Sequence, residues 1–122
     1  MLTRHIAPTP TLLAQHMAHR FVTLTQQASS SRPFTVALAG GSTPQIFYRT
    51  LATPAFRTRV PWAHIECFFG DERAVPHTHP ASNYRSADAA LFATVPAIVH
   101  PMPAAQGDTA TYTQLLAAHL PR

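Results

Sequence analysis

The sequence predicts an α/β protein with a parallel sheet, because short apolar runs alternate with segments of helical periodicity along its 122 residues. The run 34–39 is almost wholly apolar and is bounded by turn residues, which is typical of a strand buried on both faces, and residues 65–69 form the next strand candidate. Strands that alternate with helices imply parallel pairing through right-handed crossovers. We therefore expect one α/β domain over residues 1–122, a length that suits one domain and not two.

The first helix is predicted over residues 11–28. Leu13, Met17, Phe21 and Leu24 recur there at three- and four-residue steps and form one apolar helix face. The proline that precedes this stretch is a permitted helix start.

A second helix is predicted from Pro44 to Leu51, after the strand at 34–39. Thr43 is a suitable N-cap, and proline is favoured at the first helical position. Such a helix would bury Ile46, Phe47 and its last leucine.

The strand at 65–69 ends at Gly70, and a polar loop follows. Ser82 can cap a helix that reaches about Phe92, and a short strand is expected at 98–99. Asp108 can cap a last helix, in which four side chains lie at helical spacing: Tyr112, Leu115, Leu116 and His119.

The composition favours a small anionic ligand over nucleic acid as the partner. The net charge is +4, and all nine basic residues are arginines spread along the chain. Surfaces that bind nucleic acid cluster their basic residues, so we expect no nucleic-acid partner. The guanidinium group suits phosphate and carboxylate oxygens.

The protein is expected in the cytoplasm, with no membrane partner. No segment approaches the ~20 apolar residues of a membrane span, and residues 1–10 lack the apolar run of a signal peptide. The single cysteine, Cys67, cannot form an internal disulfide, and its apolar strand predicts a core position. The composition predicts no oligomeric state.

A glycine-rich turn, Gly40-Gly41-Ser42-Thr43-Pro44, joins the first strand to the second helix. Glycines allow close approach of a ligand, and a helix N-terminus suits phosphate. The same residues could form a plain strand-to-helix turn with a capping threonine.

A charged loop, Asp71-Glu72-Arg73, follows the strand at 65–69. The arginine could bind an anion and a carboxylate could act as a base, or the three could form an internal ion pair. Both motifs follow strand ends, where open parallel sheets bind ligands, so we expect the two loops to share one site.

Together these motifs resemble the 6-phosphogluconolactonase family, within the glucosamine-6-phosphate isomerase/6-phosphogluconolactonase superfamily. The matching pieces are residues 38–44, Trp62, 68–73 with 75–76, 79–80 and 82–84. The resemblance implies a Rossmann-like three-layer (α/β/α) fold of the sugar-phosphate isomerase/deaminase type. It also implies hydrolysis of 6-phospho-D-glucono-1,5-lactone to 6-phosphogluconate in the pentose phosphate pathway, with no cofactor and no metal. The small-molecule partner would be the sugar-phosphate lactone.

The same resemblance assigns the site residues. Catalytic roles fall on Asp71 and Arg73, and substrate or phosphate binding falls on Gly40, Gly41, Ser42, Thr43, Arg73 and Asn83. The family's general-base histidine lies in a Gly-His-Thr-Ala-Ser segment that does not occur in this sequence. We therefore expect the chain to be the N-terminal portion of a longer lactonase-type domain, truncated and incomplete for catalysis.

Two alternatives stay open. One is a sugar-phosphate isomerase or glucosamine-6-phosphate deaminase of the same fold, although those relatives usually have Glu-Tyr where this chain has Glu72-Arg73. The other is a noncatalytic sugar-phosphate-binding module. The histidine pairs at 16 and 19 and at 77 and 79 are expected to be solvated or loop residues and not metal ligands.

Overall fold

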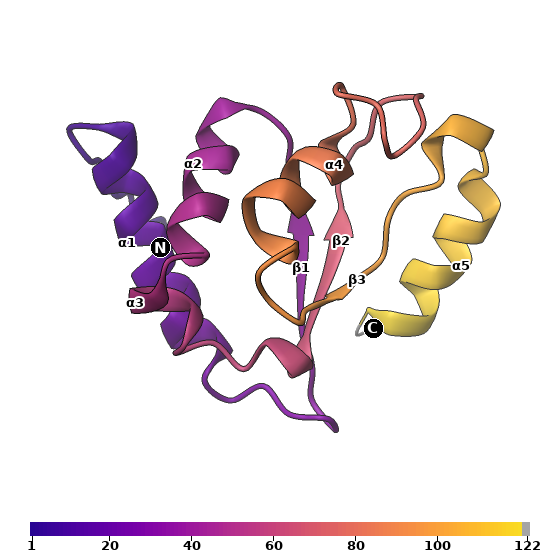
Figure 1. Cartoon of the computed structure of the whole chain (residues 1–122). Coiled ribbons are helices and arrows are strands. Elements are labelled where there is room, and N and C mark those ends of the chain that lie inside the picture. Colours follow the sequence, from indigo (N-terminus) through magenta and orange to yellow (C-terminus); the bar gives the residue numbers. More distant parts are fainter. Residues whose placement is uncertain (121–122) are drawn as a thin grey trace.

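The computed structural model describes residues 1–120, in which a three-stranded parallel sheet has helices on both sides (Figure 1). The strand order is β1 (Phe34–Leu38), β2 (Ile65–Phe69) and β3 (Ile98–Val99). β2 is central: it pairs along its whole length with β1 and at two positions with β3. The predicted parallel α/β fold class is therefore confirmed.

The helices connect these strands in the expected alternation. In chain order the longer ones are α1 (Pro10–Thr25), α2 (Ser42–Leu51), α4 (Asn83–Ala87) and α5 (Thr109–His119). The helix predicted to reach about Phe92 is present as α4 and its π-helical continuation η2 (Asp88–Phe92). Three short elements were not predicted from the sequence: α3 (Pro54–Arg57) and the 3₁₀ turns η1 (Trp62–His64) and η3 (Ala104–Gln106). None of these helices combines the length and hydrophobicity needed to cross a lipid bilayer.

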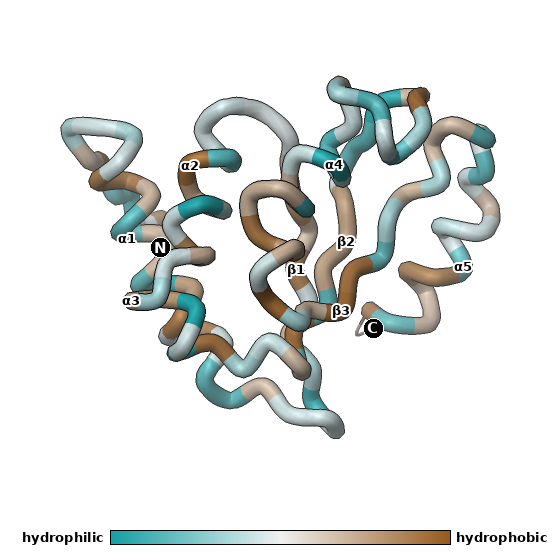
Figure 2. The backbone as a smooth tube through the Cα atoms, viewed as in Figure 1, coloured by the Kyte–Doolittle hydropathy of each residue, from teal (hydrophilic) through white to brown (hydrophobic). Residues whose placement is uncertain are grey.

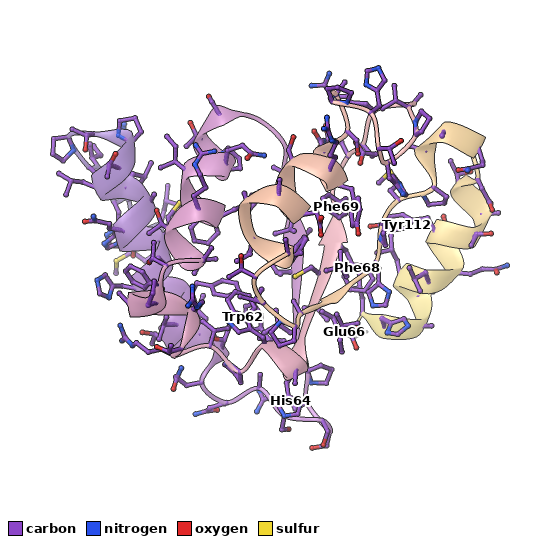
Figure 3. All side chains as sticks on the ribbon, viewed as in Figure 1. Trp62, His64, Glu66, Phe68, Phe69 and Tyr112 are labelled. Carbon is purple, nitrogen blue, oxygen red and sulfur yellow. The ribbon has the colours of Figure 1, made fainter. Side chains whose placement is uncertain are left out.

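The alternation of side chains along β2 separates two sides of the sheet. Ile65, Cys67 and Phe69 join the main hydrophobic core, together with residues of α1, α2 and η2. Glu66 and Phe68 point the other way, toward α5 (Figure 3). Cys67 is a core residue as predicted, and burial raises the pKa of its thiol to about 12.

The predicted strand β1 is found, but the prediction that both its faces are buried is wrong. Phe34, Thr35 and Val36 are half-buried, Ala37 is exposed, and only Leu38 is buried. The reason is topological, because β1 is the outer strand of the sheet and lacks a neighbour on one side among the described residues.

The face of α1 that packs inward also differs from the prediction. Its buried residues are Ala14, Ala18, Phe21, Val22 and Thr25, so the helix turns its small side chains toward α2. Of the predicted apolar face only the phenylalanine is buried. The other members, Leu13, Met17 and Leu24, line an open groove beside β1.

The start of α2 lies two residues earlier than predicted. Gly41 is the N-cap residue, with a φ of 109°, and no side chain caps the helix, so Thr43 is not the cap. A positive φ of this size favours glycine. Ser82 and Asp108 do cap α4 and α5 as predicted, accepting hydrogen bonds from Arg85 N at 3.2 Å and Thr111 N at 3.0 Å.

Trp62 and Phe56 are both buried in the interior. Figure 2 shows that hydrophobic residues concentrate along the sheet, whereas the loop that follows β2 is largely hydrophilic. The fold thus leaves its polar loops at the carboxyl ends of the strands.

Candidate functional site

The two predicted loops meet at the carboxyl edge of the sheet, and Asn83 is their junction. Gly40, after β1, packs so tightly against the Asn83 carboxamide that a methyl group at this position would overlap it. The same carboxamide donates from Nδ2 to the backbone oxygen of Asp71 at 3.2 Å and to its Oδ1 at 3.4 Å. The expected convergence of the loops is therefore present.

Glu72 organises the charged loop, a role that was not predicted from the sequence. Its Oε1 accepts hydrogen bonds from the backbone N–H groups of Arg73 and Asn83, both at 2.7 Å. Its Oε2 accepts from Ser82 Oγ at 3.0 Å and Tyr84 N at 2.9 Å. One carboxylate thus ties the loop after β2 to the N-terminus of α4.

Burial alone would raise the pKa of the Glu72 carboxyl, but the four donors favour the charged form and together lower the pKa below its ordinary value of 4.5. Glu72 is therefore a structural anion at neutral pH. Its negative charge also faces the positive N-terminal end of α4.

Arg73 is exposed, and only its backbone N–H and C=O make hydrogen bonds within residues 1–120. The internal ion pair with Asp71 or Glu72, one of the two interpretations of this loop, is not formed, since the ion pairs in this part of the chain all join Glu66 to histidines. The guanidinium group is thus free to bind an anion.

The N-terminus of α2 offers a second anion-binding feature. The first N–H of the helix to find an intrahelical acceptor is that of Gln45, which donates to Gly41 O at 3.2 Å. The N–H groups of Ser42 and Thr43 precede it, and the first turn contains no acidic side chain. Both residues are exposed, so backbone and hydroxyl donors can reach a phosphate or carboxylate.

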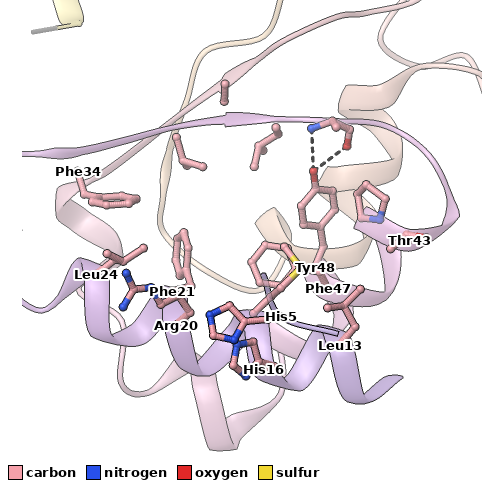
Figure 4. A pocket seen from close by; sticks show the side chains of 16 residues that line it. His5, Leu13, His16, Arg20, Phe21, Leu24, Phe34, Thr43, Phe47 and Tyr48 are labelled. Carbon is pink, nitrogen blue, oxygen red and sulfur yellow. Dashed lines mark hydrogen bonds between the residues drawn. The ribbon is translucent and has the colours of Figure 1, made fainter. Parts of the chain in front are cut away.

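Two tyrosines fix the strand ends from which these loops depart. The Tyr48 hydroxyl accepts from Ala39 N at 3.1 Å and donates to Ala39 O at 2.7 Å (Figure 4). Tyr112 does the same at the end of β2, accepting from Phe69 N at 2.8 Å and donating to Phe69 O at 3.0 Å. Each hydroxyl supplies the hydrogen bonds that a neighbouring strand would make. The helical spacing of Tyr112 in the sequence gives no sign of its contact with the end of β2, and neither tyrosine contact was predicted.

Hollows flank this edge on both faces of the sheet. The larger one, about 530 Å³, lies between α1, α2 and β1, is lined mainly by apolar side chains and includes Thr43 at its rim (Figure 4). Another, of about 370 Å³, lies toward α5 and includes Gly70 and Tyr112. Neither includes Ser42 or Arg73, so the candidate anion site is an open edge and not part of these hollows.

His77 and His79, in the polar segment that follows Arg73, make hydrogen-bonding contacts with backbone groups. His77 Nε2 lies 2.8 Å from Met102 O, and His79 Nδ1 accepts from Ala81 N at 3.0 Å. These contacts agree with the expectation that both are loop residues.

A parallel sheet with a polar, anion-accessible edge at its strand ends defines an α/β protein of the open-sheet, ligand-binding class. Residues 8–122 match the family model described as glucosamine-6-phosphate isomerases/6-phosphogluconolactonase, and the chain belongs to this family.

Individual relatives agree with this family. A 6-phosphogluconolactonase of Synechocystis is 41% identical over 101 residues, covering 71% of this chain and 40% of the relative. The structure of 6-phosphogluconolactonase from Trypanosoma brucei superposes with a TM-score of 0.84 at 27% identity, covering 99% of this chain and 52% of that one. A structure named devB protein gives a TM-score of 0.91 at 26% identity and covers 100% and 52%. The chain thus spans about half, or less, of the length of these relatives.

Proposed function

We propose that this chain carries the substrate-binding part of a 6-phosphogluconolactonase, which hydrolyses 6-phospho-D-glucono-1,5-lactone to 6-phosphogluconate in the oxidative pentose phosphate pathway. The observation that carries the proposal is the junction at Asn83, which brings the α2 N-terminus and the Arg73 loop to one edge. The names of the Synechocystis and Trypanosoma brucei relatives support the choice of reaction.

The proposed roles follow from charge and position. Arg73 is the principal contact for an anionic group of the substrate, because its guanidinium is exposed and free of carboxylate partners in residues 1–120. Gly40, Gly41, Ser42 and Thr43 form the loop that faces the sugar phosphate, as the first turn of α2 supplies donors there.

Lactone hydrolysis adds water to the C1 carbonyl and breaks the bond between C1 and the ring oxygen. The attacking water gives up a proton, the ring oxygen gains one, and negative charge develops on the carbonyl oxygen between these events. Arg73 would stabilise that charge or hold the phosphate, and Asp71 would orient the sugar. The Asn83 carboxamide holds the Asp71 backbone in place for this role.

We further propose that residues 1–122 correspond to the N-terminal portion of a lactonase-type domain that acts in the cytoplasm on a small-molecule partner. The extent of the matches supports this, because 99% of the chain superposes on 52% of the Trypanosoma brucei structure. A deaminase of the same fold is less well supported, because this chain has Arg73 at the position where the deaminases usually have tyrosine.

The test is calorimetric binding of 6-phosphogluconate to the chain and to its Arg73→Ala variant, with Arg32→Ala as the matched control. Arg32 is also exposed but precedes β1, at the opposite end of the sheet. Loss of a charge-assisted hydrogen bond predicts that the Arg73 variant binds about 10- to 100-fold more weakly, whereas the Arg32 variant binds as before. Equal losses in both variants would contradict the site.

A lactone assay of the full-length gene product, coupled to oxidation of 6-phosphogluconate, then separates the functions, because residues 1–122 are proposed to carry only the substrate-binding part. Acceleration above the spontaneous rate supports the hydrolase, and binding without acceleration supports a noncatalytic sugar-phosphate module. Preferential binding and turnover of glucosamine 6-phosphate would support the deaminase instead.

A further inference from the structure

Glu66 is an unusual residue for the central strand of a parallel sheet. It lies on the side of β2 that α5 covers, beside Phe68, and its side chain is only 13% exposed. A carboxylate this buried needs charged or hydrogen-bonding partners. None of the arginines in residues 1–120 is within ion-pairing distance of it, and its partners are two histidines.

These histidines come from two other elements. His100 directly follows β3, and its backbone N–H donates to Cys67 O at 2.9 Å, which fixes its position on the sheet. His119 is the last residue of α5. Glu66 Oε2 lies 3.5 Å from His100 Nε2 and 3.0 Å from His119 Nδ1.

The ring of His100 is held in place but has an unsatisfied nitrogen. It stacks on Phe68 with a centroid separation of 4.6 Å and lies 4.8 Å from the ring of His119. Its Nε2 is buried and has no hydrogen-bond partner among the described residues, because the 3.5 Å approach to Glu66 does not make a hydrogen bond. A buried ring nitrogen without a partner carries a free-energy cost that a bound cation would remove.

We propose that Glu66, His100 and His119 form a binding site for a divalent transition-metal ion such as Zn²⁺. One carboxylate oxygen and one ring nitrogen from each histidine lie within 4.8 Å of one another. Bonds of 2.0–2.1 Å in a tetrahedron place neighbouring ligand atoms about 3.3 Å apart, and the observed 3.0 and 3.5 Å lie on either side of that value.

To close around an ion, the ligand nitrogens of the two histidines, which lie within 4.8 Å of each other, would have to approach to about 3.3 Å. His119 stands at the end of α5 and is the most exposed of the three, at 36%, so its ring can rotate toward His100 while the other two side chains stay in place. Two imidazoles and one carboxylate suit zinc, cobalt or nickel and not Mg²⁺ or Ca²⁺, which prefer oxygen ligands. The fourth position would be left to water.

The position of the site indicates a structural role. Its ligands join β2, β3 and α5, and Glu66 lies toward the start of β2, whereas Asp71 and Arg73 follow its end. A bound ion would therefore clip α5 onto the sheet without entering the lactone site, and the metal-free expectation for the reaction is unaffected.

The experiment is calorimetric titration of untagged protein with Zn²⁺ and, separately, with Mg²⁺. We expect one tightly bound Zn²⁺ per chain, an increase of the melting temperature with Zn²⁺ concentration, and no response to Mg²⁺. Co²⁺ in place of Zn²⁺ should give the visible absorption of a four-coordinate ion, a signature that a hydrogen-bonded cluster without metal would lack.

His119→Ala is the decisive variant, because this exposed residue can be removed without opening the core. It should weaken Zn²⁺ binding by at least about tenfold and abolish the increase in melting temperature. Glu66→Gln should weaken Zn²⁺ binding in the same way, and an unchanged circular dichroism spectrum would show that this variant is folded. The matched control is the double variant His5→Ala with His16→Ala, which removes another adjacent histidine pair, whose ring centroids are 4.8 Å apart.

The outcomes are distinct. Zn²⁺ binding that survives His119→Ala but is lost in the control would assign the ion to the other pair and overturn the proposal. Absence of any Zn²⁺ binding at micromolar concentration would also overturn it and would leave Glu66 in contact with two histidines and no ion.

Discussion

Replacement of Glu72 by glutamine tests whether one carboxylate organises the candidate site. Glutamine keeps one oxygen, which can still accept from Arg73 N and Asn83 N. Its amide nitrogen then faces the Tyr84 N–H, so that hydrogen bond is lost. A hydrogen bond to a charged group contributes about 1.5–3 kcal/mol and a neutral one about 0.5–1.5 kcal/mol. Because Glu72 is only half-buried, solvent screening reduces the sum, and we expect the free energy of unfolding to fall by about 2 kcal/mol at pH 7.

The stabilisation by Glu72 should depend on pH in a defined direction. The pKa of Glu72 is lower in the folded protein than its ordinary value of 4.5, so the carboxylate stabilises the fold fully above that value. The stabilisation is lost as the pH falls through the lowered pKa of the folded protein, because the Glu72 carboxyl is then protonated in both the folded and the unfolded state. The difference between the natural protein and Glu72→Gln should therefore be full above pH 4.5 and should shrink as the pH falls below that value.

Urea denaturation at a series of pH values measures both quantities. Asp88→Asn is the matched control, because Asp88 is a half-buried carboxylate nearby whose side chain makes no hydrogen bond within residues 1–120, and its removal should change stability by less than about 0.5 kcal/mol. Equal stability of Glu72→Gln and the natural protein at pH 7, or a gap that does not shrink in acid, would refute the reasoning.

Two further predictions concern the strand ends. Tyr48→Phe and Tyr112→Phe each leave two backbone groups without partners and should lower the free energy of unfolding by about 1–3 kcal/mol, measured by thermal or urea denaturation. The two losses should add, because the two hydroxyl groups hold different strands. A negligible effect of either substitution would contradict the role of that hydroxyl. Gly40→Ala should destabilise by about 1–3 kcal/mol and weaken 6-phosphogluconate binding, because the new methyl group displaces the Asn83 carboxamide. Gly70→Ala is the control, since its methyl group would meet Leu38 O at an ordinary 3.6 Å.

The central parts of the fold could be predicted because local signals agree there with the tertiary environment. The bounds of β2 are those predicted, since an apolar run ends at a glycine and the strand is paired on both sides. The caps at Ser82 and Asp108 also follow from local chemistry.

The outer parts could not be predicted, because tertiary arrangement decides them. Periodicity identifies α1 as a helix but does not tell which of two apolar stripes meets α2. Likewise, the apolar composition of β1 cannot show that it is the outer strand. The start of α2 depends on the positive φ of Gly41, which a favourable capping threonine two residues later obscures.

The candidate site was predictable in location but not in its internal contacts. Two motifs after neighbouring strands were enough to predict that the Gly40 and Arg73 loops approach each other. The hydrogen bonds that fix them join residues about ten positions apart, such as Glu72 and Ser82, and no periodicity marks such a pair. The metal-site candidate joins three elements, and only the fold brings Glu66 and His119 together.

The outer position of β1 has a consequence for the behaviour of the protein at high concentration. Leu38 O points to β2, so the backbone groups of the alternate residues Thr35 and Ala37 point outward. Natural proteins protect such edges with charges, prolines or bulges, and the strand Phe34–Leu38 has no charged residue and no proline. Within residues 1–120 this edge is therefore open to strand addition between copies of the chain.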